Sequence, residues 1–113
     1  MSVTIYHNPR CNTSRKTRAL LEKRGVAPRV IEYLKTPPSA AELKQLLAKL
    51  GTSPRDLLRK KEAKEAGLDK SGLTNAQLIA GMVKHPITIE RPIVVKGNRA
   101  ALGRPPEAVL KIL

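Results

Sequence analysis

Residues 2–34 read SVTIYHNPRCNTSRKTRALLEKRGVAPRVIEYL, and the order of short elements in this stretch decides the fold. It opens with the β-branched run 2–6, which is typical of a strand. After a polar loop, Thr13 or Ser14 is expected to cap a helix, and residues 29–34 form a second strand pattern. A strand, a helix and a strand joined by short loops form a βαβ unit. The two strands are therefore expected to be parallel.

The rest of the chain adds helices and then a hairpin. Ser39 begins a capping box before a leucine-rich stretch with helical spacing, and Thr74 begins another. Between them, Ser53-Pro54 opens a short helix. Gly97-Asn98 joins two further strand patterns in a tight hairpin, and Pro105-Pro106 opens a final helix. The order β-α-β, helical insert, β-β-α predicts a mixed α/β domain.

Length and composition limit the classes of protein to consider. The 113 residues suffice for one domain and are too few for two. Apolar residues make up 41% of the chain and charged residues 27%, which argues against a disordered chain. No apolar run approaches the roughly 20 residues that cross a bilayer, and the N-terminus lacks the pattern of a signal peptide. We therefore expect a cytoplasmic protein without a membrane partner.

The chain is strongly basic, with 22 Lys and Arg against 9 Asp and Glu and a formal net charge of +13. Such an excess favours an anionic partner: nucleic acid, an anionic membrane surface or a small oxyanion. The tight basic clusters at 15–18 and 59–61 contain no aromatic residue that could stack on bases, so nucleic acid is not the expected partner. For most of these residues the alternative is a solvated basic surface.

Cys11 is the one cysteine of the chain, and it lies between a strand end and a helix start. A single cysteine excludes an internal disulfide and a cysteine-rich zinc site, and His7 and His85 add too little for a metal site. The unpaired N–H groups and the dipole at a helix start favour an anion such as a thiolate. Arg10 and Arg15 flank the thiol and should also lower its pKa. We expect a reactive thiol, with a buried structural cysteine as the alternative.

Ser14 stands where a Cys-x-x-Cys motif would carry its second cysteine. Dithiol exchange within one chain is therefore excluded. A resolving thiol must come from outside, for example from glutathione or a partner protein. Asn12 and Thr13 complete, with Ser14, a set of small polar groups that can donate hydrogen bonds to the thiolate.

Six motifs follow one another along the chain: HNPRCNTSR at 7–15, YLKTPP at 33–38, LLRK at 57–60, HPI at 85–87, ERPIVV at 90–95 and GRP at 103–105. This set resembles the glutaredoxin-coupled arsenate reductases of the ArsC family and spans nearly the whole chain. The chain ends at Leu113, directly after the last expected helix, and in this it is similar to the short chromosomal members of the family.

The resemblance implies a thioredoxin-like fold for residues 1–113, with a mixed four-stranded sheet and a helical insertion at about 39–85. It also implies the reduction of arsenate to arsenite without a bound cofactor or metal. Glutathione is then the co-substrate, and glutaredoxin reopens the mixed disulfide that forms. A monomer is expected.

The resemblance also assigns site residues. Cys11 matches the family nucleophile, and Arg59, Arg91 and Arg104 match the three arginines that surround the oxyanion. For each arginine, a place on the solvated surface is the alternative.

Further assignments concern the surroundings of the thiol. His7 matches a histidine thought to lower the pKa of the thiol, with a structural role at the strand end as the alternative. Pro92 matches the cis-proline that thioredoxin-like folds place beside the active cysteine. The remaining loop residues have a supporting role: Asn12, Thr13, Ser14 and Arg15.

Two other functions are compatible with one reactive cysteine. An Spx-type redox regulator, from a sister branch of the family, binds RNA polymerase and typically carries Cys-x-x-Cys, which Ser14 interrupts. A monothiol thiol transferase would use no oxyanion substrate. Neither function needs three arginines around one thiol, so arsenate reduction is the expected function.

Overall fold

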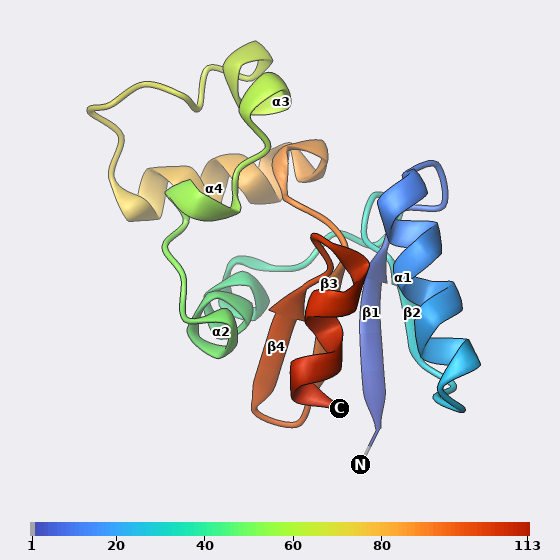
Figure 1. The fold of residues 1–113 in the computed structure, drawn as a ribbon. Coiled ribbons are helices and arrows are strands. Elements are labelled where there is room, and N and C mark those ends of the chain that lie inside the picture. The colour runs from blue at the N-terminus through green and yellow to red at the C-terminus, as the bar shows by residue number, and fades with distance from the viewer. Residues whose placement is uncertain (1) are drawn as a thin grey trace. The chain divides into compact units, whose positions relative to one another are not determined.

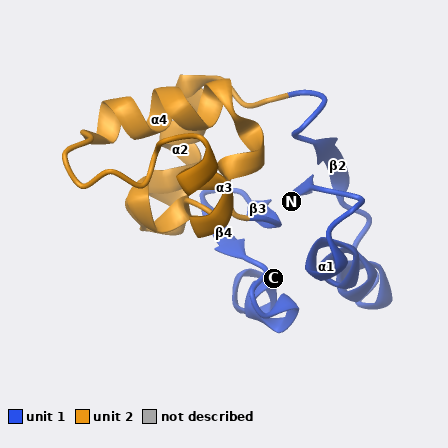
Figure 2. Cartoon of the chain, turned by 90° about the horizontal axis from the view of Figure 1, so that it is seen from above, with its two compact units in different colours: residues 1–36, 91–113 blue, residues 37–90 orange. Residues whose placement is uncertain are grey.

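The computed structural model describes residues 2–113, which form two compact units. The first unit combines the N-terminal segment up to Thr36 with residues 91–113, and the second comprises residues 37–90 (Figure 2). The opening βαβ stretch and the final hairpin thus share one unit, and the helical insert forms the other. Within the described chain, no helix is both long enough and apolar enough to span a bilayer.

The first unit contains a mixed four-stranded sheet with the strand order β2-β1-β3-β4 (Figure 1). Its strands are β1 (Val3–His7), β2 (Arg29–Glu32), β3 (Ile93–Lys96) and β4 (Arg99–Leu102). Strand β1 pairs in parallel with β2 and antiparallel with β3, and β3 pairs antiparallel with β4. The predicted βαβ unit, the hairpin and the mixed α/β class are confirmed.

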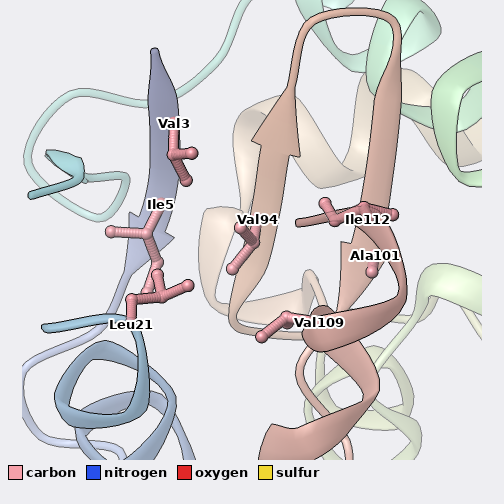
Figure 3. Close-up of a cluster of buried hydrophobic side chains, with 7 residues drawn as sticks. All are labelled: Val3, Ile5, Leu21, Val94, Ala101, Val109 and Ile112. Carbon is pink, nitrogen blue, oxygen red and sulfur yellow. The ribbon is translucent and has the colours of Figure 1, made fainter. Parts of the chain in front are cut away.

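One face of this sheet packs against helix α1 (Asn12–Lys23) and the 3-10 helix η3 (Pro106–Ile112). Figure 3 shows the buried side chains that form the core between them, and these are Val3, Ile5, Leu21, Val94, Ala101, Val109 and Ile112. Alternate residues of a strand point to the same face, which is why Val3 and Ile5 both contribute. The core is aliphatic, since the chain has no Phe and no Trp.

Helix α1 begins earlier than the sequence predicts. Its N-cap is Cys11, without a hydrogen bond from a capping side chain, so the prediction of Thr13 or Ser14 as the cap is wrong. The Arg15 N–H already bonds to the Cys11 carbonyl at 3.0 Å, and Ser14 is fully buried with its hydroxyl bonded to other groups. The thiol therefore stands at the N-terminal end of the helix itself.

The second unit consists of α2 (Ala40–Leu50), α3 (Lys60–Glu65) and α4 (Asn75–Lys84), with the 3-10 turns η1 (Arg55–Leu57) and η2 (Pro86–Thr88). Helix α2 packs against α4 through buried residues: Leu43, Leu46, Leu47, Leu78, Ile79 and Met82.

Both predicted capping boxes in this unit have the expected cap. The Ser39 hydroxyl accepts the Glu42 N–H at 3.1 Å, and the Thr74 hydroxyl accepts the Gln77 N–H at 3.2 Å. Helix α3 was not predicted as a separate element. Its six residues bury only Ala63, so the sequence carries no apolar periodicity there.

Candidate active site

The loop between β1 and α1 is held in a tight turn by Asn8. The Asn8 carbonyl accepts the Cys11 N–H at 3.0 Å, and its side-chain Oδ1 accepts the Arg10 N–H at 3.0 Å. A side chain of Asn that bonds to the backbone two residues ahead stabilises such turns. Sequence reasoning did not single out Asn8, although Asn before Pro is a turn signal. The turn leaves the Cys11 thiol half-buried.

Several groups act on the pKa of the Cys11 thiol. Burial alone would raise this pKa, but the Ser14 backbone N–H and the Arg91 guanidinium interact favourably with the thiolate, and Arg91 and Arg104 add positive charge. Together these donors and charges outweigh burial and hold the pKa of Cys11 below its ordinary value, because they stabilise the anion. The predicted activation of the thiol therefore has a structural basis.

Arg91 and Arg104 reach Cys11 from a distant part of the sequence. The Arg104 Nη2 donates to the Cys11 Sγ at 3.6 Å, and its Nε donates to the Arg91 carbonyl at 2.8 Å. Arg91 precedes β3 and Arg104 follows β4, and the antiparallel pairing of these strands brings their ends together. Two guanidiniums therefore lie beside the thiol, with the planar donor geometry that suits a tetrahedral oxyanion.

Arg10 and Arg15, the sequence neighbours predicted to lower the pKa of the thiol, are not the arginines that do so. The Arg15 guanidinium turns to the loop instead, where Nη1 donates to the Pro9 carbonyl at 2.8 Å and Nη2 to the Asn12 Oδ1 at 3.1 Å. The guanidiniums that lower the pKa come from the two ends of the β3–β4 hairpin. The pairing of β3 with β4 brings these two guanidiniums to the thiol. The spacing of residues in the sequence could not reveal this approach.

His7 is buried at the end of β1 and contacts Ser14. Its Nδ1 lies 2.6 Å from the Ser14 Oγ, which also accepts the Asn8 N–H at 3.1 Å. Burial, and then the charge of Arg18, lower the pKa of His7, so the neutral ring is favoured at neutral pH. Ser14 is also the residue whose backbone N–H lowers the pKa of Cys11. Any influence of His7 on the thiol therefore passes through Ser14.

Thr17 and Pro92 lie on either side of a close approach at Gly103 that sequence reasoning missed. The Thr13 carbonyl accepts the Thr17 hydroxyl at 2.9 Å, and the Arg91–Pro92 peptide bond is cis, as the resemblance implies. A Cβ atom at Gly103 would lie 2.6 Å from the Thr17 Oγ1 and 2.8 Å from the Pro92 Cγ. Only glycine fits between these two side chains without displacing them.

Arg59 belongs to the second unit, where it is the N-cap of α3. Its Nε lies 3.3 Å from the Glu62 Oε1, and its Nη1 lies 3.5 Å from the Glu90 Oε1. The three side chains are 24%, 18% and 20% exposed, so both ion pairs are partly buried. The pairing of Arg59 with Glu62 could have been predicted from the sequence, because residues three positions apart on a helix are neighbours. The pairing with Glu90 could not.

The groups around Cys11 favour an anionic ligand. They are backbone N–H and guanidinium donors, which bind oxygen atoms that carry negative charge. Across residues 2–113, no group of three or more His, Cys, Asp or Glu side chains is arranged to hold a metal ion.

Comparison with known proteins agrees with the motifs. The model of the ArsC family matches residues 6–112. The chain belongs to the ArsC family. It is 46% identical over 114 residues to the arsenate reductase of Neisseria meningitidis serogroup A, with 98% of this chain and 97% of that protein covered. It is 52% identical over 114 residues to YfgD of Escherichia coli K12, which is named as an uncharacterized protein. That match covers 98% of this chain and 96% of YfgD.

A solved structure supports the same family and fold. An arsenate reductase from Vibrio cholerae superposes on this ArsC-family chain with a TM-score of 0.96 at 53% sequence identity, covering 100% of this chain and 98% of that one. The expected family and the α/β, thioredoxin-like fold class are therefore confirmed.

Proposed function

We propose that this ArsC-family chain is an arsenate reductase with Cys11 as its nucleophile. The observation that carries the proposal is the set of groups that stabilise the Cys11 thiolate: Arg104, whose Nη2 donates to the sulfur at 3.6 Å, together with Arg91 and the Ser14 N–H, which lower the pKa of the thiol. Donors that stabilise a thiolate are equally suited to the oxygens of an oxyanion bound to that sulfur. The named arsenate reductases among the relatives support arsenate as the substrate.

In the first step, the Cys11 thiolate forms a bond to the arsenic of arsenate. One arsenate oxygen takes up two protons and leaves as water. Arg91 and Arg104 stabilise the negative charge on the remaining oxygens through charge-assisted hydrogen bonds.

In the second step, glutathione is the co-substrate, and the reaction needs no bound cofactor. Its thiolate attacks the Cys11 sulfur, the bond between sulfur and arsenic breaks, and the bonding electron pair moves to arsenic. Arsenic(V) thereby becomes arsenic(III) and leaves as arsenite, while Cys11 and glutathione remain joined in a mixed disulfide. Glutaredoxin then reopens this disulfide by thiol–disulfide exchange.

The dependence on glutathione also bears on where the enzyme works. Thiols remain reduced in the cytosol, and we therefore assign this chain to the cytoplasm. We propose that it acts there as a monomer.

The remaining site residues have supporting roles in this proposal. Arg59 is included as a third ligand of the oxyanion on the family resemblance. A guanidinium has five N–H donors, so pairing with Glu62 and Glu90 leaves donors for an oxyanion. His7 acts through Ser14, and the shape of the loop depends on Asn12, Thr13, Arg15 and Pro92.

The direct test is the arsenate-dependent oxidation of NADPH in the presence of glutathione, glutaredoxin and glutathione reductase. We expect the wild-type chain to support turnover and Cys11→Ser to abolish it while the protein stays folded. Unaltered turnover in Cys11→Ser would mean that the reaction does not pass through this thiol.

The arginines provide a second, quantitative test. Loss of a charged hydrogen bond costs roughly 1.5–3 kcal/mol, or about 10- to 150-fold. We therefore expect Arg59→Ala, Arg91→Ala and Arg104→Ala each to lower kcat/KM for arsenate by at least about tenfold. Lys60→Ala removes an exposed charge and should change it little. Equal losses at Lys60 and Arg59 would show that general charge attraction, rather than a site, accounts for the binding.

A further inference from the structure

Cys11 cannot be regenerated by this chain alone. It is the one cysteine in the sequence, so a sulfur adduct on Cys11 must be attacked by a thiol from outside. A thiol that attacks Cys11 comes close to the loop that carries it. The exposed side chains of this loop are therefore placed to act on that thiol.

Arg15 presents a fixed positive charge on this loop. Its side chain is exposed, yet Nη1 donates to the Pro9 carbonyl at 2.8 Å and Nη2 donates to the Asn12 Oδ1 at 3.1 Å. Pro9 and Asn12 lie on either side of Cys11 in the sequence. The guanidinium is therefore fixed on the loop that carries Cys11, with three of its five N–H donors not engaged in these two bonds.

The partners of Arg15 are neutral, so its charge is not compensated locally. Among residues 2–113, the ion pairs join Arg18 to Glu22, Lys35 to Glu32, and Arg59 to Glu62 and Glu90, and none includes Arg15. The unit that contains Cys11 is also the more basic one. Residues 1–36 and 91–113 carry 13 basic and 3 acidic side chains, against 9 and 6 in residues 37–90.

We propose that Arg15 binds a carboxylate of the resolving thiol, and that the chain thereby selects a small carboxylate-bearing thiol over a neutral one. The need for an external thiol rests on the proposed function, in which glutathione has this role. The carboxylate accepts charge-assisted hydrogen bonds from the remaining Arg15 donors. This contact holds the thiolate beside the Cys11 sulfur.

The competing explanation is that Arg15 only clamps the loop. Its bonds to Pro9 and Asn12 would then shape the surroundings of Cys11 for every attacking thiol alike. A clamp affects all thiols by the same factor, whereas a carboxylate site affects only thiols that carry a carboxylate. The ratio of the exchange rates with two such thiols, one with and one without a carboxylate, therefore separates the two roles.

The test follows exchange at Cys11 without arsenate. Cys11 is first converted to its mixed disulfide with 2-thiopyridine. An attacking thiolate then forms a bond to the Cys11 sulfur, the bond to the pyridyl sulfur breaks, and pyridine-2-thione leaves with the electron pair and takes up a proton. Rates are measured by stopped-flow absorbance with glutathione and with its diethyl ester, each corrected for its thiolate fraction, and mass spectrometry confirms the product.

We expect Arg15→Gln to slow exchange with glutathione about three- to tenfold and to leave exchange with the ester within about twofold. Lys16→Gln is the matched control, because it removes one exposed charge from the neighbouring position. It should change the glutathione rate by less than about twofold. Arg15→Lys, which keeps the charge, should recover part of the loss.

Three results would overturn the proposal: an equal loss with glutathione and the ester, an equal loss in Arg15→Gln and Lys16→Gln, or no recovery in Arg15→Lys. Because arsenate is absent, these rates do not depend on whether the chain reduces arsenate. A chain that shows the selectivity but no arsenate turnover would refute the proposed function and leave this inference standing.

Discussion

At the scale of single residues, Ser14 connects the buried end of β1 with the thiol. Its hydroxyl bonds to the His7 ring and accepts the Asn8 N–H, while its backbone N–H lowers the pKa of the Cys11 thiol. The side chain therefore stabilises the loop, and the backbone stabilises the thiolate. A substitution can separate these two contributions.

Ser14→Ala should lower the free energy of unfolding by about 1–3 kcal/mol, because it leaves buried polar groups of His7 and Asn8 without their partner. The pKa of Cys11 should stay below its ordinary value, since the backbone N–H remains. Urea denaturation measures the first effect. Ser71→Ala, at an exposed position, is the control and should leave the free energy of unfolding unchanged. Equal unfolding free energies in the two variants would contradict the burial argument.

The lowered pKa of Cys11 predicts both reactivity and a pH dependence of stability. The rate of alkylation by iodoacetamide should have its midpoint below the value of about 8.5 for free cysteine, and Arg91→Gln should raise that midpoint. The folded pKa lies below the unfolded one, so the thiolate stabilises the fold above the unfolded pKa. This stabilisation is lost as the pH falls through the folded pKa. A wild-type midpoint at or above about 8.5 would remove the case for an activated thiol.

At the scale of elements, the end of β4 approaches α1 at Gly103. A Cβ there would come within 2.6 Å of the Thr17 Oγ1 and 2.8 Å of the Pro92 Cγ. Gly103→Ala should therefore cost about 1–3 kcal/mol of stability through overpacking. It should also lower activity, because Arg104 follows directly. Thermal unfolding is the measurement, with Gly72→Ala as control, since a Cβ at Gly72 meets no atom within 4 Å. A Gly103→Ala variant as stable as this control would disprove the close packing.

The secondary structure was largely predictable because its signals are local. The caps at Ser39 and Thr74 and the Gly97-Asn98 turn each occupy a few consecutive residues, and the structure contains all three, with the reciprocal bond of a capping box present at Thr74. The start of α1 was not predictable in this way. Ser14 is a good helix cap by type, but its burial against His7 engages the hydroxyl elsewhere.

The contacts within the site depend on parts of the chain that lie far apart. The approach of Arg104 to Cys11 follows from the pairing of β3 with β4, and 93 positions separate the two residues. From residue types alone, Arg15 was the better candidate to act on the thiol. Only the family resemblance pointed to the distant arginines.

At the scale of the whole molecule, the formal charge of +13 should make stability depend on salt. Like charges repel one another in the folded state, and salt screens this repulsion. Raising sodium chloride from about 20 mM to about 200 mM should therefore raise Tm by a few degrees. Sulfate at equal ionic strength should raise Tm further in the wild type than in Arg104→Ala if an oxyanion site is present. A Tm that does not respond to chloride would contradict the repulsion.

The pairing of Arg59 with Glu62 and Glu90 also constrains how this family can diverge. A neutral residue in place of Arg59 would remove the positive charge that pairs with two partly buried carboxylates. This loss would lower the stability of the folded chain. Loss of either glutamate alone would change the balance in the opposite direction. Among descendants of a common ancestor, these three positions should therefore change together. Under the proposed role of Arg59 as an oxyanion ligand, a lineage that abandons arsenate as its substrate should replace the glutamates along with the arginine.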